Sequence, residues 1–549
     1  MKYQELVDVY EKLAATTKRL EKTNILSEFL KTVNGEILPE VSLMCLGRVF
    51  PSWSEEEQGV GDKLIMKAVA DVVGVSVDKV EDEVREQGDI GAASEKLFGE
   101  KKQMTFFSKP LTIEFVFKNL RKLTKITGSK STSRKISIIL ELLSSASGVE
   151  SKYICRTIVE QLRIGVGEGI LRDAIAEAFS IDNKIVDRAY MLTNNIGLVA
   201  KVAKEEGSDA LSKLNLVPGT PVKLMLAQLS KGIDESINEM GLALIETKYD
   251  GIRCQLHKHG DKITLFTRRL ENVTNAIPEI VDAIREAFPD EDFIAEGEVI
   301  ATRDGKPLSF QNILHRVRRK YNIEEAMKDI PLEVYLYDLL YYKRPRIDDP
   351  IIERRKTLES IVTTSNMVHL SELVLCTPEN TQDAKDLFNK SIAEGHEGIM
   401  IKNANEPYIP GVRGKKMLKF KAEPENLDVV VVGGTKGIGK RGDFIGSYLV
   451  ALQDKDENLK TVAMVGTGLS DDQLEKLTEK MEEYKIVEKG TKIKVEPKII
   501  FEVAYSEIVK SPEYEAGYSL RFPVVKRIRE DKGVKDIDTV ERLESMYNG

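Results

Sequence analysis

The sequence has few cysteines and no long apolar run. With no Cys-x-x-Cys pair and no histidine at zinc-ligand spacing, its cysteines exclude a structural zinc site and a disulfide framework. The N-terminus carries acidic Glu5 and Asp8, whereas a signal peptide is basic and then apolar. No apolar run approaches the roughly 18 residues that span a membrane. We therefore expect a soluble cytoplasmic protein with no membrane partner. The cysteines are Cys45, Cys155, Cys254 and Cys376.

The sequence also lacks an excess of positive charge. Its 81 lysine and arginine residues and 89 aspartate and glutamate residues give a net charge of -8, which on its own argues against a nucleic-acid partner. Basic residues nevertheless cluster at 127–135, 315–320 and 436–441. Because local charge can differ from the average, the protein can still present positive faces.

The domain organisation follows from length and periodicity. At about 100 to 200 residues per domain, 549 residues predict about three domains. Residues 1–215 show mainly helical periodicity, which predicts an all-α domain. Residues 216–221 contain two prolines and a glycine, which predicts a linker. In residues 222–423 short strands and helices alternate irregularly, which predicts an α+β domain with antiparallel sheets.

The last part of the chain, residues 424–549, is rich in short apolar strands. The expected strands are 427–432, 447–452, 461–465, 492–495 and 499–503. Five short strands in a compact segment predict an OB-fold β-barrel. The tail over 532–547 is predicted to be helical, with Asp538 as the N-cap before 539–547.

One hexapeptide is suited to present a nucleophile. The chain contains Lys248-Tyr249-Asp250-Gly251-Ile252-Arg253 after the apolar run 242–245, so Lys248 ends an expected strand and a turn follows. A lysine with its ordinary pKa of about 10.4 needs burial or a cationic neighbour, such as Arg253, to act as a nucleophile. A lone lysine at a strand end is usually only solvated. The whole hexapeptide resembles motif I of the covalent nucleotidyltransferases, which include DNA ligases, RNA ligases and mRNA capping enzymes.

Other segments resemble further nucleotide-binding parts of this superfamily. Residues 266–274 resemble the second motif, which implies that Arg268 binds the ribose or the 5′-phosphate of the acceptor. Tyr337 offers an aromatic face for adenine, although a tyrosine in an apolar run is more often part of the core. The resemblance also implies that Glu246 and Arg253 belong to the nucleotide site.

Two glutamates are candidate metal ligands. Residues 295–300 resemble motif III, which implies that Glu298 contacts ribose and metal, and residues 397–402 resemble motif IV, which implies that Glu397 binds metal. Mg²⁺ is commonly bound by one or two carboxylates together with phosphate oxygens and water. Two glutamates from separate strands therefore suit a site for ATP with Mg²⁺ or Mn²⁺.

Period-two spacing from Lys415 places Lys415, Lys419 and Lys421 on one face of an expected strand over 415–421. The segment resembles motif V, which implies that Lys419 and Lys421 meet the α-phosphate, with Arg413 assisting. Such cations stabilise the charge that builds up as pyrophosphate leaves. Met417 stands where the family often has tryptophan.

Near the C-terminus, residues 527–532 resemble motif VI of the OB domain. The resemblance implies that Arg529 and Lys532 orient the departing pyrophosphate, which makes domain closure part of catalysis.

Residues 434–441 contain the G-x-x-x-x-G-K pattern of a phosphate-binding P-loop. Arg441, however, replaces the required Ser or Thr, and residues 446–450 are predicted to form a strand where a P-loop needs a helix. We interpret this segment as a basic hairpin loop in which Lys440 and Arg441 face DNA.

The helical part contains candidate DNA contacts. Residues 161–168 resemble a helix junction in the DNA-binding domain of archaeal and eukaryotic replicative ligases, where glycines let backbone amides approach phosphates. The polar run 127–135 fits the same role, or is a solvated loop. The expected contacts are Arg163, Gly165, Gly167, Lys130, Arg134 and Lys135.

Residues 103–107 resemble the shortened motif that binds the sliding clamp PCNA. Gln103 precedes the adjacent aromatics Phe106 and Phe107. Adjacent phenylalanines are usually core residues, so the clamp assignment depends on the family setting.

The motifs occur in order from Lys248 to Lys532, and the chain is similar over nearly its full length to archaeal-type ATP-dependent DNA ligases. The resemblance implies a monomeric, nucleoid-associated enzyme that seals nicked duplex DNA through lysyl-AMP in replication, repair and recombination. An RNA ligase or capping enzyme, which needs no helical DNA-binding domain, and a non-catalytic, clamp-tethered DNA-binding protein are the alternatives. The sequence leaves open whether ADP, NAD or GTP also serves as nucleotide donor.

Overall fold

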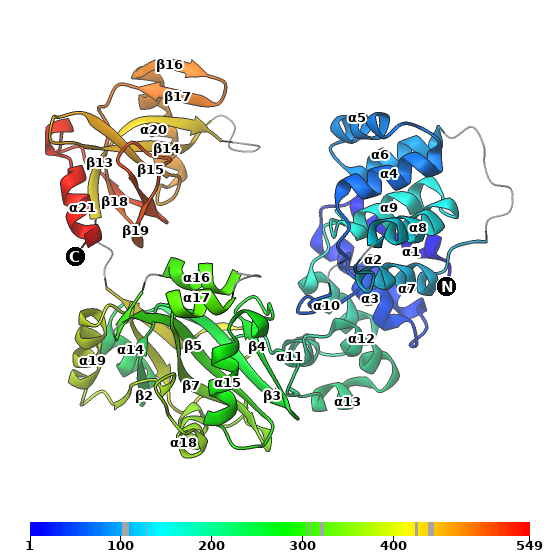
Figure 1. Ribbon diagram of the computed structural model, residues 1–549, viewed down its shortest axis with the longest axis horizontal. Coiled ribbons are helices and arrows are strands. Elements are labelled where there is room, and N and C mark those ends of the chain that lie inside the picture. Colours follow the sequence, from blue (N-terminus) through cyan, green and yellow to red (C-terminus); the bar gives the residue numbers. More distant parts are fainter. Residues whose placement is uncertain are drawn as a thin grey trace. The chain divides into compact units, whose positions relative to one another are not determined.

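Two compact units make up the chain, Met1–Lys421 and Ala422–Gly549 (Figure 1). The computed structural model describes all residues except 57, 101–108, 129, 304, 309, 319–322, 423–425, 438–443 and 549. Within the described part, every helix is too short or too polar to cross a membrane.

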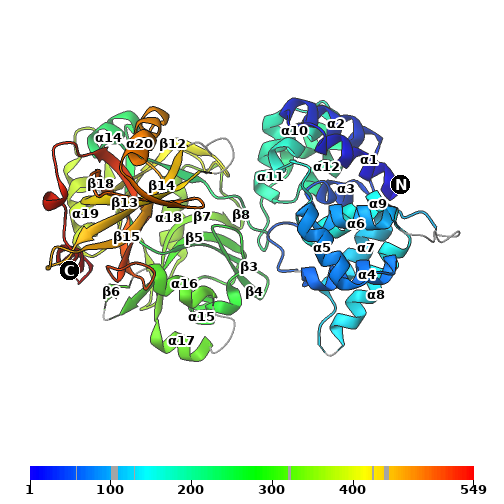
Figure 2. The same cartoon turned by 90° about the horizontal axis from the view of Figure 1, so that it is seen from above.

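The first part of the Met1–Lys421 unit is helical, as predicted (Figure 2). The helices bury their apolar faces in one core that includes Tyr3, Leu30 and Ile139. Side-chain caps fix several helix starts; for example, the Ser147 hydroxyl accepts a hydrogen bond from the Glu150 amide. The helices are α1 (Tyr3–Ala14), α2 (Arg19–Thr32), α3 (Leu38–Met44), α4 (Asp62–Val73), α5 (Val77–Gln87), α6 (Ile90–Gly99), α7 (Ile113–Thr124), α8 (Ser131–Ser144), α9 (Gly148–Ile158), α10 (Glu168–Ala178), α11 (Asn183–Thr193), α12 (Ile196–Glu205) and α13 (Gly207–Lys213).

The segment 216–221, predicted to be a linker, is packed against a sheet. The Gly219 amide donates to Nδ1 of His257 at 3.2 Å, and Leu216 shares a buried cluster with Ile294. The boundary between the two compact units lies after Lys421, close to the predicted domain boundary at 423. Residues 216–221 lie within the first unit.

The remainder of this unit is an α+β fold with two sheets, as predicted. One sheet has the strand order β1-β12-β11-β2-β10; the other has the order β4-β3-β5-β7-β8, with β6 beside β5 and β9 beside β7. Pairing is antiparallel except between β1 and β12 and between β7 and β9. The strands are β1 (Leu226–Leu229), β2 (Ala243–Lys248), β3 (Ile252–His259), β4 (Lys262–Thr267), β5 (Phe293–Arg303), β6 (Lys306–Pro307), β7 (Leu332–Tyr342), β8 (Arg344–Pro345), β9 (Val368–Leu370), β10 (Leu373–Cys376), β11 (Gly398–Asn403) and β12 (Arg413–Lys421).

Helices cover one face of each sheet. Apolar residues of α14 and α19 pack against Ile245, Ile399 and Leu418 of the first sheet, and α15 packs against the second. Because side chains alternate along a strand, the charged residues of β2 and β11, and Lys419 and Lys421 of β12, lie on the face opposite α14 and α19. The helices are α14 (Ile233–Met240), α15 (Pro278–Ala287), α16 (Phe310–Arg318), α17 (Ile323–Asp329), α18 (Ile351–Ile361) and α19 (Gln382–Ala393).

The Ala422–Gly549 unit is built mainly from β-strands, and it contains the five predicted strands. One sheet runs β15-β14-β13-β17-β16, with β18 joining β13 to β21, and β19 pairs with β20. The elements are β13 (Asn426–Lys436), β14 (Ile445–Gln453), β15 (Leu459–Val465), α20 (Asp471–Glu483), β16 (Lys485–Lys489), β17 (Lys492–Val495), β18 (Ile500–Ala504), β19 (Glu507–Lys510), β20 (Tyr518–Arg521), β21 (Val524–Ile528) and α21 (Val540–Asn548). The strand predicted at 446–450, which argued against a P-loop, is confirmed as part of β14.

The predicted C-terminal helix over 532–547 is wrong at its N-terminal end. Helix α21 starts at Val540, and its N-cap is Thr539, whose Oγ1 accepts from the Arg542 amide at 3.2 Å. Asp538 is not the cap because its carboxylate is committed to β13, where it accepts from the Asp428 amide at 2.8 Å.

Gly398 starts β11, and only glycine fits there. Its φ is 138°, and a Cβ atom would lie 2.2 Å from the carbonyl oxygen of Phe420 on β12. Gly398→Ala should therefore strain the backbone and separate β11 from β12, lowering the unfolding free energy by on the order of 2 kcal/mol. Thermal unfolding followed by circular dichroism measures this change.

The matched control is Gly414→Ala in β12, where a Cβ would meet only Cγ1 of Val412, at 3.9 Å. Equal unfolding temperatures for the two variants would contradict the close-packing argument.

Candidate active site

The strand register brings Lys248 next to two other candidate residues. Lys248, the last residue of β2, lies opposite Gly398 of β11, which in turn lies opposite Lys421 of β12. One step along the same strands, Glu246 and Lys419 flank β11 in the same way. Because these positions alternate with the core residues, all four charged side chains lie on the polar face of the sheet.

Glu397 joins two of these lysines. Its carboxylate contacts the ammonium group of Lys248 and lies 2.5 Å from Nζ of Lys421. Its amide donates to the Lys248 carbonyl at 3.0 Å, which fixes the backbone. Burial alone would raise the pKa of Glu397, but Lys248 and Lys421 lower it to about 2. Glu397 is therefore ionised at neutral pH.

Lys419 completes a cluster of positive charge. Burial and the neighbouring cations Lys421 and Lys248 lower its pKa. Lys248 and Lys421 share the Glu397 carboxylate and Lys419 adds a third positive charge beside them, so the cluster carries an excess of positive charge. Such a cluster is suited to bind an anion with several charges, such as a polyphosphate.

Glu298 brings a second carboxylate from the other sheet. It lies in β5 opposite Arg253 of β3. Burial raises the pKa of Glu298 to about 7, outweighing the opposite effect of Lys248 and Arg253. A carboxyl group in this state gains from an added cation, which would favour its ionised form. Gly251 allows the close approach of the β2–β3 turn, since a Cβ there would lie 2.4 Å from the Val299 carbonyl oxygen.

Two carboxylates supply the oxygen donors that Mg²⁺ prefers. Among the described residues, no group of three or more His, Cys, Asp or Glu side chains is arranged to hold a metal ion. The donor set thus fits Mg²⁺ only together with oxygens from a ligand, as in sites where phosphates complete the coordination.

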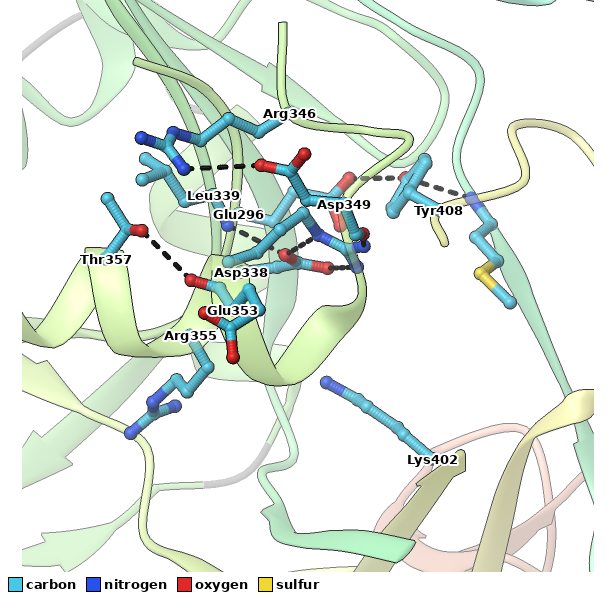
Figure 3. Close-up of polar contacts among 12 residues, drawn as sticks. Glu296, Asp338, Leu339, Arg346, Asp349, Glu353, Arg355, Thr357, Lys402 and Tyr408 are labelled. Atoms are coloured by element: carbon cyan, nitrogen blue, oxygen red, sulfur yellow. Dashed lines mark hydrogen bonds and ion pairs between the residues drawn. The ribbon is translucent and has the colours of Figure 1, made fainter. Parts of the chain in front are cut away.

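Arg253 is paired with Glu296 rather than with the carboxylate near Lys248. Its guanidinium lies 2.5 Å from Glu296 and donates to the Met225 carbonyl at 2.8 Å. Tyr408 donates to the same glutamate at 2.8 Å (Figure 3). Glu296, in the same sheet, balances the charge of Arg253, and Lys421 is the cation that shares a carboxylate with Lys248.

Glu246 is also fully engaged, by two cations that the sequence analysis did not identify. Its carboxylate contacts Nζ of Lys402 and lies 3.4 Å from the Arg355 guanidinium. Nζ of Lys402 also lies 4.7 Å from the ring centroid of Tyr337. Figure 3 labels Lys402 and Arg355 in the neighbourhood of Asp338 and Glu296. The signal that could have found Lys402 is the period-two alternation of β11, which puts it on the face of Glu246.

Tyr337 and Arg413 occupy different surroundings. Tyr337 is half-buried in β7, and burial raises its pKa well above the ordinary value. Arg413 is the exposed first residue of β12, and Arg268 is exposed in the turn after β4. The structure therefore gathers Glu246, Lys248, Glu298, Tyr337, Glu397, Lys419 and Lys421 between the two sheets.

Arg529 and Lys532 lie in the Ala422–Gly549 unit. Both pair there with Asp428, Arg529 at 3.2 Å and Lys532 at 2.5 Å. Sequence analysis missed Asp428, because its partners are about a hundred residues away.

The candidate DNA contacts of the helical part have local partners. Nζ of Lys135 donates to the Gln58 carbonyl at 2.7 Å, and a guanidinium nitrogen of Arg134 donates to the Thr127 carbonyl at 3.1 Å. Lys130 precedes α8 with a φ of 61°.

The segment 161–168 bends sharply, with φ values of 58° at Arg163 and 65° at Gly165, and Gly167 is the N-cap of α10. Non-glycine residues rarely adopt positive φ, so Arg163 marks a constrained segment. Gln103, Phe106, Phe107, Lys440 and Arg441 lie outside the described residues.

Comparisons with known protein families match three segments of the chain. Residues 2–176 match the model described as DNA ligase N terminus, residues 224–421 the ATP dependent DNA ligase domain, and residues 441–532 the ATP dependent DNA ligase C terminal region. These matches define the class as the DNA ligases.

Two curated relatives are similar to this sequence over nearly its full length. The DNA ligase of Methanobrevibacter smithii is 66% identical over 548 residues, covering 100% of both chains. That of Methanothermobacter thermautotrophicus is 59% identical, covering 99% of this chain and 98% of its own. The solved structure described as "Pmar-Lig_PreS3" has a TM-score of 0.55 at 19% identity, covering 95% of this chain and 99% of its own, and shows a likeness of fold. The chain belongs to the ATP-dependent DNA ligase family, whose members seal nicks in DNA.

The Lys402–Glu246 pair is a target for a stability test. Lys402→Met would leave a buried carboxylate with only the longer contact to Arg355, so we expect the free energy of unfolding to fall by on the order of 3 kcal/mol. Urea denaturation measures it. Lys416→Met in β12 is the control, because its pair with Glu406 is exposed (48% and 28%), and such pairs contribute about 1 kcal/mol or less. Matching urea midpoints for both variants would rule out a stabilising buried pair.

Proposed function

We propose that this DNA ligase works through a covalent AMP on Lys248. Nζ of Lys248 attacks the α-phosphorus of ATP, the bond from that phosphorus to the bridging oxygen breaks, pyrophosphate leaves, and the amine gives up its proton to solvent. The observation that carries the proposal is the convergence of Lys248 and Lys421 on Glu397, with Lys419 beside them. It supports a site where a lysine meets a phosphate among fixed cations.

Two further transfers complete the reaction. A 5′-phosphate oxygen at the nick attacks the phosphorus of the bound AMP, which releases the Lys248 amine and leaves the AMP joined to DNA. The 3′-hydroxyl then attacks the 5′-phosphate, loses its proton and displaces AMP, so that the strand is sealed. Lys419 and Lys421 stabilise the phosphoryl oxygens as charge develops in the first step.

The nucleotide is held by residues from both sheets. Tyr337 offers its ring to the base, Glu246 and Arg253 line the same site, and Arg268 and Arg413 reach the nucleotide from exposed positions. Glu298 and Glu397 would hold Mg²⁺, or Mn²⁺, jointly with phosphate oxygens. When bound, this ion supplies positive charge that makes the α-phosphorus a better electrophile.

The chain is proposed to form a DNA-binding domain (1–215), a linker (216–221), an adenylation domain (222–423) and an OB-fold domain (424–549). The strands of the last domain support an OB-like barrel. Its Arg529 and Lys532 orient the departing pyrophosphate. Contacts to nicked duplex DNA come from Lys130, Arg134, Lys135, Arg163, Gly165, Gly167, Lys440 and Arg441, with cations and backbone amides facing phosphates.

The enzyme is proposed to act as a monomer on cytoplasmic, nucleoid-associated DNA in replication, repair and recombination. A sliding clamp of the PCNA type would recruit it through Gln103, Phe106 and Phe107. The RNA ligase, capping-enzyme and non-catalytic alternatives are not favoured, because the full-length relatives are named DNA ligases.

Mass spectrometry tests the nucleophile. Incubated with ATP and Mg²⁺ but no DNA, the wild-type protein should gain one AMP, and Lys248→Ala should gain none, because its side chain has no amine to form the bond. Lys262→Ala, an exposed lysine at the start of β4, should gain AMP like the wild type. Nicked duplex DNA should discharge the adduct and become sealed. An AMP adduct on Lys248→Ala would refute the assignment.

The clamp motif has a separate test. Replacing both Phe106 and Phe107 by alanine should weaken binding to the sliding clamp at least about 10-fold in calorimetry, since buried aromatics dominate such contacts. AMP formation should be unchanged. Phe115→Ala, which removes an aromatic 37% exposed on α7, is the control and should bind normally. Normal binding by the double variant would exclude this motif.

A further inference from the structure

Asp428 joins the two cations proposed to meet pyrophosphate. The Arg529 guanidinium lies 3.2 Å from Oδ1 and 3.3 Å from Oδ2 of Asp428, and Nζ of Lys532 lies 2.5 Å from Oδ2. Asp428 and Arg529 are 13% and 14% exposed, so this contact is largely shielded from solvent. One carboxylate thus bridges a guanidinium and an ammonium group that would otherwise repel each other.

The backbone around Asp428 is fixed on both sides. Within β13, Asp428 lies opposite Glu502 of β18, which lies opposite Arg527 of β21. Its amide donates to the Asp538 carboxylate at 2.8 Å, and its carbonyl accepts from the Asp538 amide at 2.8 Å. Because the backbone of Asp428 is fixed in this way, its carboxylate can orient the long, flexible side chains of Arg529 and Lys532.

The other carboxylates around Arg529 are placed differently. Asp531 lies 2.8 Å from the guanidinium but is 67% exposed, and Glu502 lies farther away, at 3.6 Å, and also pairs with Arg527. Within the described part of the chain, neither forms an ion pair with Lys532. Asp428 is therefore the carboxylate, among the described residues, that contacts both cations at once.

We propose that Asp428 is a positioning residue, which holds Arg529 and Lys532 side by side so that they meet the departing pyrophosphate as one unit. This inference rests on the proposed role of these two cations. Because Asp428 acts through them, its removal should affect the steps in which pyrophosphate takes part and spare the step in which it does not.

Asp428→Asn in the full-length protein tests this, because it keeps the shape of the side chain and removes its charge. We expect AMP formation from ATP, and its reversal by added pyrophosphate, each to slow about 10-fold, as is usual when a residue that orients a functional group is lost. Sealing of a nick that already carries 5′-AMP should keep its wild-type rate. Asp454→Asn is the control: Asp454 lies in the same unit, is 18% exposed and pairs with Lys460 at 3.6 Å.

Asp428→Glu separates charge from shape. It keeps the negative charge in a longer side chain, so it should retain faster AMP formation than Asp428→Asn. A packing role predicts the reverse order, because asparagine is the closer match in shape. The reverse order, or an equal loss in all three assays, would overturn the inference.

Arg529→Met distinguishes failure of the inference from failure of the proposed function. If Arg529→Met slows the two pyrophosphate steps and Asp428→Asn does not, the inference fails and the role of the cations stands. If neither variant slows them, the role of the cations fails as well. If both do, adding Asp428→Asn to Arg529→Met should cause little further loss, because the two residues act together.

Discussion

The candidate active site depends on the ion pairs that the Glu397 carboxylate forms with Lys248 and Lys421. This carboxylate lies where β2, β11 and β12 meet, and it holds the ammonium groups of Lys248 and Lys421 together. Without this negative charge, three lysines gathered on one face would repel one another. The backbone contributes as much as the side chain, because Gly398, the next residue, permits a strand approach that any Cβ would block.

The second sheet, which contains β3 and β5, faces this lysine cluster and has a buried ion pair of its own. Arg253 and Glu296 neutralise each other. The pKa of Glu298 is raised by burial, so a nearby cation would stabilise its ionised form. The space between the sheets therefore combines an excess of cations on one wall with a carboxyl group on the other. This charge pattern is complementary to the proposed ligand, a nucleoside triphosphate with a divalent ion.

Sequence predicted the local features well. Period-two spacing in 415–421 gave the correct face for Lys419 and Lys421, and the helical and α+β parts of the fold followed from the change from helical to strand periodicity. Partners distant in the chain were missed: Lys402 and Asp428 have contacts that only the strand pairing brings together. Strand β16 was missed because all its residues are exposed and it has no buried side.

The predicted start of the C-terminal helix was wrong for a related reason, a partner distant in the chain. Asp538 has the right residue type for a helix N-cap, but β13 competes for its carboxylate. That competition has a consequence for the end of the chain. The Asp538 carboxylate accepts from the Asp428 amide and also pairs with Arg542 of α21. Asp538 therefore links helix α21 to strand β13, which carries Asp428. Truncation before residue 538 would remove these contacts from β13, so the C-terminal tail is part of the framework that holds Asp428, the partner of Arg529 and Lys532.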